Sequence, residues 1–366
     1  MLPDTINFIR KLTLRKLWNI LVVQLSYSFS AILKRPIVWG SPWFVSIEPA
    51  SVCNLTCPQC PVGAGDIARE NKFMTEDAYR ELLDQISPST SMLSLYFQGE
   101  PLMNQRFARF VRLASDRNIY TQTSTNGQLL TEDVCRELVD AGLDRIIISL
   151  DGTDQESYQT YRRGGEFQKV EHGVRTLDRL RREKGSNKPY LIIQFLVFRH
   201  NQLQIPEAKR LARDWGADKL WIKSAQIEYP ESADELIPVA NGNKESLSPK
   251  GSGPVFPHKF SRYEKSPSGE WKLRATLRNR CKRLWQTTVI TSDKIIVPCC
   301  FDKRAEFPMG RLGGKEMSGE QNPAVASGFG SIWKSKEYQD FRKKVLTERK
   351  GIEICTNCTE GIAKLS

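Results

Sequence analysis

Short apolar segments and amphipathic segments alternate regularly between residues 43 and 222. Six short apolar segments are predicted to be strands: 43–48, 93–97, 119–123, 145–149, 190–198 and 219–222. Segments with helical periodicity lie between and after them: 76–86, 105–117, 132–141, 155–161, 167–182 and 203–215. Strands that alternate with helices predict an α/β fold with a parallel sheet and right-handed crossovers. Periodicity alone does not distinguish a barrel from an open, doubly wound sheet.

The alternation stops after the sixth predicted strand. Residues 227–275 are rich in Pro, Gly, Ser and charged side chains and show no sustained period, which predicts a linker or a loop over a site. Beyond them, residues 286–291 and 294–297 predict a β-hairpin, and residues 332–346 predict an amphipathic helix. We therefore expect four parts: an N-terminal helical segment (1–42), a core (43–226), a linker or insert (227–275) and a small α+β domain (276–366).

The N-terminal segment contains an uncharged stretch, residues 17–33, in which apolar side chains repeat at three- and four-residue steps. This pattern predicts an amphipathic helix. The stretch is too short, and too rich in Asn, Gln and Ser, to span a membrane. We expect the helix to pack against the body of the protein. The alternative is a helix on a membrane surface, where basic residues would face lipid headgroups: Arg10, Lys11, Arg15 and Lys16.

Composition limits the classes of function. The chain has 366 residues, of which 40% are hydrophobic, so it can bury a large core and is not disordered as a whole. Its net charge of +12 favours an acidic partner: a nucleic acid, lipid headgroups or an acidic electron-transfer protein. The nine cysteines are clustered, with three of them within eight residues. In a chain of this length such clusters indicate metal ligation rather than a disulfide framework.

The densest cluster has the spacing C-x3-C-x2-C and directly follows the first predicted strand: Cys53, Cys57 and Cys60. Thiolates are soft ligands that suit iron–sulfur clusters, which take four of them. Three ligands leave one position open, as in catalytic rather than structural metal sites. A zinc site with a distant fourth ligand, or cysteines without a metal, would also fit this triplet.

Polar residues stand at the carboxyl ends of the later predicted strands. Each short motif is an ordinary turn when taken alone. Parallel α/β proteins build their sites from several successive strand ends, so we expect these residues to converge beside the cysteine loop. They are Glu100, Thr125, Asn126, Ser149, Asp151 and Asn201.

The cysteine triplet together with these motifs resembles the radical S-adenosylmethionine (SAM) superfamily. The resemblance implies a partial (β/α)6 barrel in which Cys53, Cys57 and Cys60 hold a [4Fe–4S] cluster whose open iron binds SAM. Gln98-Gly99-Glu100-Pro101 resembles the family's Gly-Gly-Glu element, which contacts the SAM amino group, although Gln98 replaces the first Gly. Gly99 and Glu100 are the two residues that carry over from this element. Tyr161-Arg162-Arg163-Gly164 resembles an arginine element of the family, in which we expect Arg163 to contact SAM. The resemblance places the remaining strand-end residues around SAM as well.

A second set of cysteines lies near the C-terminus: Cys281, Cys299, Cys355 and Cys358. Four ligands make a closed site for zinc or a cubane cluster. Downstream of a radical SAM core, the pattern resembles a SPASM or Twitch domain. The cysteine number fits the shorter form, with one auxiliary [4Fe–4S] cluster. Cys300 is either an alternative ligand or a neighbour of the site, and Cys135 is predicted to be core.

The resemblance implies reductive cleavage of SAM to a 5′-deoxyadenosyl radical, which removes a substrate hydrogen atom. The product would be an oxidised or cross-linked peptide or small molecule, formed with help from the auxiliary cluster. No catalytic side chain is assigned, but Gln226, Glu228 and Tyr229 could face the substrate. Two other classes remain open: a non-catalytic scaffold with structural metals, and a basic zinc-containing nucleic-acid-binding protein. The second lacks a recognisable binding motif.

Basic residues gather at the start of the C-terminal domain: Arg274, Arg278, Arg280, Lys282 and Arg283. They form either a solvated charged face or a dock for an acidic electron donor, a flavodoxin or ferredoxin. The expected location is the cytoplasm, with a peripheral position at the membrane if residues 10–33 lie on lipid.

Overall fold

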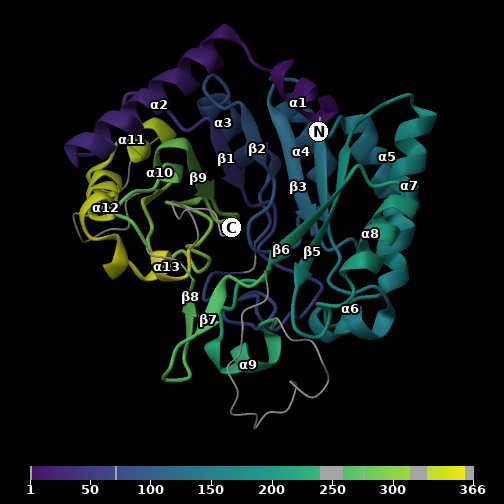
Figure 1. Cartoon of the computed structure of the whole chain (residues 1–366). Helices are drawn as coiled ribbons and strands as arrows, with labels where there is room; N and C mark the ends of the chain where they lie inside the picture. The colour runs from purple at the N-terminus through teal and green to yellow at the C-terminus, as the bar shows by residue number, and fades with distance from the viewer. Residues whose placement is uncertain (1, 71, 240–258, 275–276, 314–327, 359–366) are drawn as a thin grey trace.

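The computed structural model describes residues 2–70, 72–239, 259–274, 277–313 and 328–358 (Figure 1). Within them, a nine-stranded sheet has the order β11-β10-β9-β1-β2-β3-β4-β5-β6. Strands β1 to β6 are mutually parallel, as the alternating pattern predicts. They are β1 (Phe44–Ile47), β2 (Met92–Ser94), β3 (Tyr120–Thr125), β4 (Arg145–Ser149), β5 (Tyr190–Val197) and β6 (Lys219–Ser224). The α/β fold class is therefore confirmed, and the sheet is open because β6 and β11 form its two edges.

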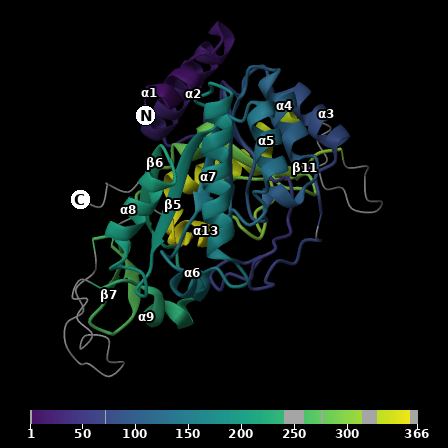
Figure 2. The ribbon, with the colours of Figure 1, turned by 90° about the vertical axis from the view of Figure 1, so that its right-hand side faces the viewer.

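The helices that connect these strands lie side by side along one side of the sheet (Figures 1 and 2). They are α3 (Glu76–Ile86), α4 (Phe107–Ser115), α5 (Glu132–Ala141), α6 (Gln155–Tyr161), α7 (Phe167–Glu183) and α8 (Ile205–Asp214). Local signals set their ends. Thr75 caps α3 and Thr131 caps α5 through their side-chain oxygens, and Gly142 ends α5 in the left-handed conformation at φ 80°.

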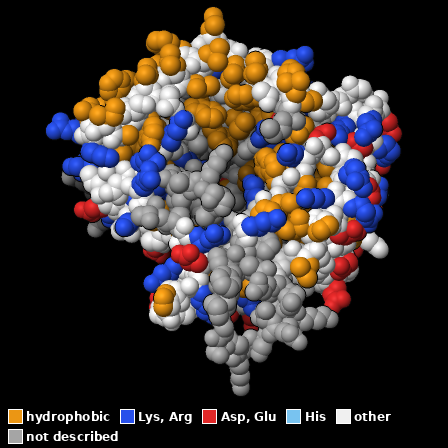
Figure 3. Space-filling view, in the orientation of Figure 1, with side chains coloured by type: hydrophobic (Ala, Val, Ile, Leu, Met, Phe, Trp, Pro, Cys, Tyr) orange, Lys and Arg blue, Asp and Glu red, His pale blue; other side chains and the backbone are white. Residues whose placement is uncertain are grey.

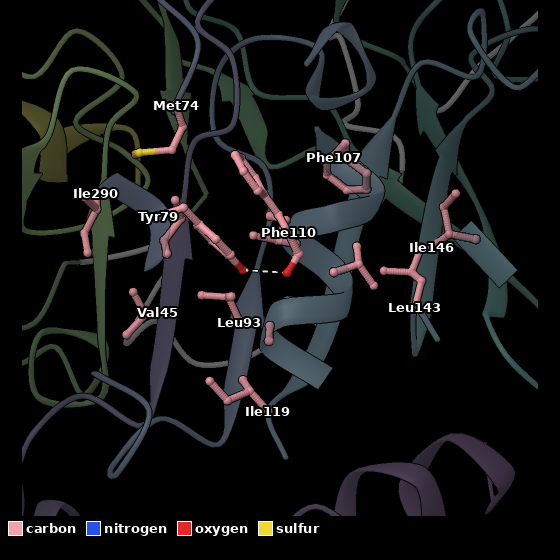
Figure 4. Packing of buried hydrophobic residues seen from close by; sticks show 14 of the residues in the cluster. Val45, Met74, Tyr79, Leu93, Phe107, Phe110, Ile119, Leu143, Ile146 and Ile290 are labelled. Carbon is pink, nitrogen blue, oxygen red and sulfur yellow. Dashed lines mark hydrogen bonds between the residues drawn. The ribbon is translucent and has the colours of Figure 1, made fainter. Parts of the chain in front are cut away.

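Large apolar side chains fill the space between the sheet and the helices (Figure 4). Tyr79 of α3 and Phe110 of α4 stack with their ring centroids 4.2 Å apart. The Tyr79 hydroxyl donates to the Phe110 carbonyl at 3.0 Å, so its polar end is satisfied in the core. Both rings lie over Leu93 of β2, which is fully buried (Figure 4). This packing holds the carboxyl ends of the strands in fixed relative positions.

The C-terminal elements extend this sheet instead of forming a separate one. The predicted hairpin is confirmed as β9 (Thr287–Ile290) and β10 (Ile295–Val297), followed by β11 (Gly310–Arg311). Strand β9 pairs in parallel with β1, although more than 200 residues separate the two strands in sequence. Buried Glu48, at the end of β1, receives hydrogen bonds from Arg69 and from the backbone of Ser292. The two predicted domains therefore share one hydrophobic core across the sheet.

Two expectations for the C-terminal half differ from the structure. The segment 227–275 is partly ordered: it contains α9 (Ala233–Leu236) and the antiparallel pair β7 (Tyr263–Lys265) and β8 (Trp271–Leu273). Residues 240–258 and 275 of that segment lie outside the described residues. The single predicted helix at 332–346 is instead two helices, because Ser335 caps a new helix start. These helices are α11 (Phe329–Trp333) and α12 (Lys336–Thr347), which precede the short helix α13 (Glu353–Thr356).

The N-terminal segment folds as two helices, α1 (Leu2–Ile9) and α2 (Leu14–Leu33), of which only the second is predicted from the sequence. Helix α1 lies at the amino ends of the strands, where buried Asp4 contacts Arg145 and Tyr120. Between the two helices, Lys11 donates to buried Asp144 at 2.6 Å. These contacts attach the N-terminal segment to the edge of the sheet opposite the cysteine loop.

Candidate active site

The cysteine triplet lies in the loop that follows β1, at the carboxyl edge of the sheet. Cys57 is buried, and Cys53 and Cys60 are partly exposed. The loop turns tightly, with the Cys60 amide donating to the Cys57 carbonyl at 3.1 Å. The apolar side chains of Tyr161 and Phe198 pack against it. Burial raises the pKa of the Cys53 thiol to about 11, so this thiol stays protonated at neutral pH until a metal displaces the proton.

Gly99 lets the loop after β2 approach the cysteine loop closely. A Cβ atom on Gly99 would lie 2.2 Å from the Ala50 carbonyl oxygen and 2.5 Å from that of Val52. The next residue, Glu100, donates its amide to the Val52 carbonyl at 2.8 Å. Only glycine fits here, because any side chain would push the two loops apart.

Glu100 is the centre of a buried hydrogen-bond network that joins two strand ends. Its carboxylate accepts from the Thr125 hydroxyl and from the Asn126 amide, both at 2.8 Å. The Asn126 side-chain amide in turn donates to Asn54 at 2.8 Å and to the Cys53 sulfur at 3.7 Å. Burial raises the pKa of Glu100 despite these hydrogen bonds. The structure thus brings Gly99, Glu100, Thr125 and Asn126 together beside Cys53.

The arginine beside the cysteine loop is Arg162 and not Arg163. Arg162 donates to Asp151 at 2.6 Å and contacts the Cys57 sulfur at 3.9 Å. Arg163 is exposed and contributes only its backbone carbonyl, which accepts from Thr56. The expectation for Arg163 therefore differs from the structure by one residue. The reason is that α6 ends at Tyr161, and the φ and ψ of the next residue direct the Arg162 side chain inward.

Asn201 and Ser149 occupy buried positions at the same edge. The Asn201 side chain donates to the Asp151 and Leu196 carbonyls and accepts from the Phe198 amide. Its amide is therefore fully engaged with protein groups and positions Asp151. Ser149 is the last residue of β4 and is also buried.

Three of the four C-terminal cysteines act on Arg349: Cys281, Cys355 and Cys358. All four cysteines of the set are buried. Burial is the main cause that raises the pKa of Cys299 well above its usual value, and the charges of Cys300, Cys281 and Cys358 add to it. Arg349 donates to the Cys358 sulfur at 3.5 Å. Burial alone lowers the pKa of Arg349, but the nearby thiolates outweigh that cost and raise it.

The hydrogen-bond partners of Arg349 indicate whether this site suits an anionic metal cluster. The residue is fully buried, and its hydrogen bonds to described residues go to carbonyl oxygens, a side-chain amide and sulfur, with no carboxylate among them. A buried guanidinium needs negative charge nearby, and cysteine thiolates supply it. The described residues contain no group of three or more His, Cys, Asp or Glu side chains arranged to hold a metal ion. The fit therefore rests on the thiol donors and on this buried cation.

The two remaining cysteines differ from the ligand candidates. Cys135 is fully buried on α5 and contacts only core groups, so the prediction that it belongs to the core is confirmed. Cys300 accepts a hydrogen bond from Arg283 at 3.2 Å and acts electrostatically on Tyr96. The Cys300 sulfur therefore lies near Arg283 and Tyr96.

A cavity of about 660 Å³ opens between the insert and the C-terminal elements. Its lining includes Gln226, Glu228 and Tyr229, which the sequence nominates for substrate contact, together with Phe301, Arg304 and Asn357. Asn357 lies within the terminal C-x2-C, and Phe301 follows Cys300 directly. The cavity therefore borders the C-terminal cysteine site.

Gln59 connects this cavity to the first cysteine loop. Its side-chain oxygen accepts from the backbone amides of Glu228 and Tyr229 at 2.7 and 2.8 Å. Its amide group donates to Ser232 at 3.1 Å. Because Gln59 immediately precedes Cys60, the loop that carries the cysteines also supports one wall of the cavity.

Sequence reasoning missed four polar residues that organise these sites: Gln59, Arg162, Arg304 and Arg349. Gln59 and Arg162 are next to or within motifs that the sequence had already singled out, so proximity to a motif was an available signal. Arg304 and Arg349 lie in segments without a pattern, and no sequence signal marks them.

Two protein families match this sequence. The radical SAM superfamily matches residues 47–195, and SPASM, an iron–sulfur cluster-binding domain, matches residues 281–359. The chain is 26% identical over 200 residues to a tungsten-containing aldehyde ferredoxin oxidoreductase cofactor-modifying protein of Pyrococcus furiosus, covering 53% of this chain and 54% of that protein. It is 29% identical over 195 residues to the PqqA peptide cyclase of Bradyrhizobium diazoefficiens, covering 51% and 48%. The chain thus spans about half the length of these relatives.

Solved structures share the fold at low sequence identity. Streptococcus suis SuiB bound to S-adenosylmethionine matches with a TM-score of 0.56 and 14% identity, over 90% of this chain and 74% of that one. The protein anSMEcpe with bound AdoMet matches with a TM-score of 0.54 and 16% identity, over 88% and 90%.

Proposed function

Because the chain belongs to the radical SAM superfamily and carries a SPASM iron–sulfur cluster-binding domain, we propose that it is an enzyme that cleaves SAM reductively and oxidises or cross-links a peptide or small molecule. One observation carries the proposal. The three-cysteine loop lies at the strand edge where the Glu100 network and the Asp151–Arg162 pair converge on it. Three thiols with an open fourth position, backed by buried polar groups, suit a cluster that also binds SAM.

When bound, the [4Fe–4S] cluster and SAM supply an electron and a 5′-deoxyadenosyl radical that removes a hydrogen atom from the substrate. In this proposal Cys53, Cys57 and Cys60 hold the cluster. Arg162 contacts the Cys57 sulfur, so its charge stabilises the thiolate form. Glu100 accepts hydrogen bonds from Thr125 and Asn126, which orients its carboxylate at the edge where SAM would bind.

The direct test of this proposal is the release of 5′-deoxyadenosine by iron-loaded protein in the presence of SAM and dithionite. Iron–sulfur proteins absorb near about 400 nm and zinc proteins do not, so the spectrum of the same sample identifies the metal. A colourless, zinc-loaded protein without this activity would favour a structural-metal scaffold or a nucleic-acid-binding protein instead.

We assign one auxiliary cluster to Cys281, Cys299, Cys355 and Cys358. Support comes from the buried cation Arg349, which contacts these thiols and has no carboxylate partner among the described residues. The cavity of about 660 Å³ borders this site, and Gln59 links its wall to the first cysteine loop. We therefore place the substrate in this cavity, within reach of both cysteine sites.

A peptide or small molecule is the substrate class that the cavity and the comparisons support best. One relative in sequence is a PqqA peptide cyclase, and another is a GTP 3′,8-cyclase. SuiB, which shares the fold with a TM-score of 0.57, has been solved with a precursor peptide. The cavity offers aromatic surfaces and charged groups, a combination that suits an amphipathic substrate.

Glu228 provides a test of this cavity. It pairs with Lys303 and Arg304, both at 2.8 Å, and although burial alone would raise its pKa, these cations lower it. Glu228→Gln removes the shared carboxylate and leaves both cations facing the cavity. We expect product formation to fall about tenfold, with SAM cleavage in the absence of substrate unchanged.

The matched control is Glu231→Gln, which changes an exposed carboxylate nearby that does not line the cavity. Product formed per 5′-deoxyadenosine released is the quantity to measure. An equal loss of SAM cleavage in the Glu228 variant would argue against a separate role of the cavity in substrate binding.

The basic residues around Cys281 support an acidic electron donor as partner. Arg278, Arg280 and Lys282 are exposed and flank this cysteine, whereas Arg283 contacts Cys300. Clustered surface cations attract acidic proteins over distances of about one Debye length. We propose that a flavodoxin or ferredoxin docks on this face, next to the auxiliary site.

If this face docks the donor, turnover driven by flavodoxin should fall steeply as salt rises, because screening weakens the attraction. Turnover driven by dithionite should change little. Replacing Arg278, Arg280 and Lys282 with Ser should remove the salt dependence, and the measurement is the initial rate at several salt concentrations. Equal salt dependence with both reductants would show that these residues form only a solvated charged surface and do not dock the donor.

A further inference from the structure

Helix α2 is attached to the body of the protein through its polar side chains. Lys16 donates to the Asn118 carbonyl at 2.6 Å, just before β3 begins. Asn19 donates to the Ser41 carbonyl at 2.9 Å and to the Ser89 carbonyl at 3.2 Å. The buried Ser30 hydroxyl accepts from the Ile37 amide. The inner face of α2 is thus held by these hydrogen bonds together with two side chains that pack on the body of the protein, Val23 in the core and Tyr27 against Trp285.

The outer face of α2 is apolar and exposed. Leu14 is 86% exposed, Trp18 66% and Ile32 75%. The full set repeats at helical spacing along one side: Leu14, Leu17, Trp18, Leu21, Leu25, Phe29, Ile32 and Leu33. Figure 3 shows hydrophobic side chains along the upper left edge of the molecule, where α2 runs in Figure 1. This arrangement is the reverse of a soluble surface helix, which buries its apolar side.

Positive charge surrounds this apolar face. Residues 5–47 contain six Lys and Arg and no Asp or Glu. Four of these cations are exposed and lie before or near the ends of α2: Arg10, Arg15, Lys34 and Arg35. Figure 3 shows Lys and Arg side chains at the left end of the same edge. An apolar face flanked by cations complements a surface that has anionic groups above hydrocarbon.

We propose that α2 docks this protein onto an anionic lipid bilayer, lying in the plane of the headgroups. Helix α2 begins at Leu14 and has 20 residues, so by length and composition it could cross a membrane, which corrects the expectation from the shorter uncharged stretch. Its polar side is bound to the body of the protein, so only the outer face is available to lipid. Pairing of α2 with a second copy is disfavoured because it would bring two acid-free, basic segments together. The inference does not rest on the proposed catalytic function.

Docking through α2 leaves the first cysteine loop and the cavity free. The hydrogen bonds of α2 to the sheet lie at the amino ends of β2 and β3, and the first cysteine loop lies at the carboxyl edge of the same sheet. Tyr27, on the inner face of α2, packs on Trp285 and interacts electrostatically with Cys281, so it is this inner face that borders the C-terminal cysteine site. The cavity-lining strands β7 and β8 are likewise far from α2 in Figure 1. A membrane-bound protein would therefore direct its cavity away from the lipid.

The test is flotation of the full-length, iron-loaded protein with vesicles of neutral phosphatidylcholine alone or mixed with anionic phosphatidylglycerol. We expect binding to the anionic vesicles and much weaker binding to the neutral ones. The variant Trp18→Gln/Leu21→Gln/Leu25→Gln should reduce binding by about tenfold or more. Leu203→Gln is the matched control, because Leu203 is 74% exposed and lies outside the N-terminal helices. The circular dichroism spectrum of each variant reports whether it is folded.

A second variant tests the charges. Arg15→Ser/Lys34→Ser/Arg35→Ser should weaken binding to anionic vesicles and make the remaining binding insensitive to salt. Unchanged flotation of the triple Gln variant would overturn the proposal. Failure of the wild-type protein to bind either kind of vesicle would also overturn the proposal. If light scattering then showed a dimer that the triple Gln variant dissociates, the apolar face of α2 would be an interface between two copies of the chain.

Discussion

Replacing Cys53, Cys57 and Cys60 together with Ala is expected to abolish the release of 5′-deoxyadenosine while leaving about one cluster's worth of iron. The three thiols are the only cysteines described in the loop after β1, so their loss removes every soft ligand from that site. The C-terminal set has four cysteines of its own, three of which act on Arg349. Iron content and 5′-deoxyadenosine, measured on the same anaerobic sample with dithionite, give the result.

The control for this variant is Cys135→Ala, which removes a buried thiol of α5 that contacts only core groups. It should keep the iron content and the SAM cleavage of the wild-type protein. Substantial 5′-deoxyadenosine from the triple variant would show that the assignment of the catalytic site to this loop is wrong.

Replacing Cys355 and Cys358 with Ser is expected to halve the iron content, roughly, and to stop product formation while sparing SAM cleavage. The reason is that the first cysteine loop has its own ligands and its own polar network, in which Asn126 joins Glu100 to Cys53. The two sites should therefore lose metal independently. Iron, 5′-deoxyadenosine and product should be measured on the same preparation.

The same double variant should also loosen the end of the chain. Arg349 is fully buried and relies on the thiols for negative charge. Removing the charge partner of a buried cation costs about 3 kcal/mol or more. We expect faster hydrogen exchange in α12 and α13, with the protection of β3 and β4 unchanged.

Cys300→Ser is the matched control for the auxiliary site, because Cys300 is adjacent to Cys299 and accepts a hydrogen bond from Arg283, and it is not one of the four assigned ligands. It should retain full iron content. A double variant at Cys355 and Cys358 that also kept full iron content would contradict the assignment of a cluster to the C-terminal four-cysteine site.

The sequence alone determined the order of elements in the core and the soft donor atoms that each cysteine site carries. Helix α3 has the predicted bounds, 76–86, because apolar spacing and the Thr75 cap are local properties. Helix α5 is predicted equally well between Thr131 and Gly142. The cysteine positions identify the donor atoms, because a thiolate is a soft ligand wherever it lies in the sequence.

Only the tertiary structure decided how distant segments meet. The pairing of β9 with β1 joins segments more than 200 residues apart, and strand pairing has no signature in local periodicity. The choice of Arg162 over Arg163 depends on the backbone angles after α6, and the contact of Gln59 with Glu228 depends on where the insert folds.

The orientation of helix α2 was likewise not predictable from the sequence pattern. Periodicity predicted an amphipathic helix, but it could not tell which face turns inward. The body of the protein offers α2 carbonyl acceptors at the amino ends of the strands. The polar side therefore faces the protein, and the apolar side remains exposed. Periodicity records the difference between two faces of an element, whereas the side that is buried depends on the partner surface, which forms only when the chain has folded.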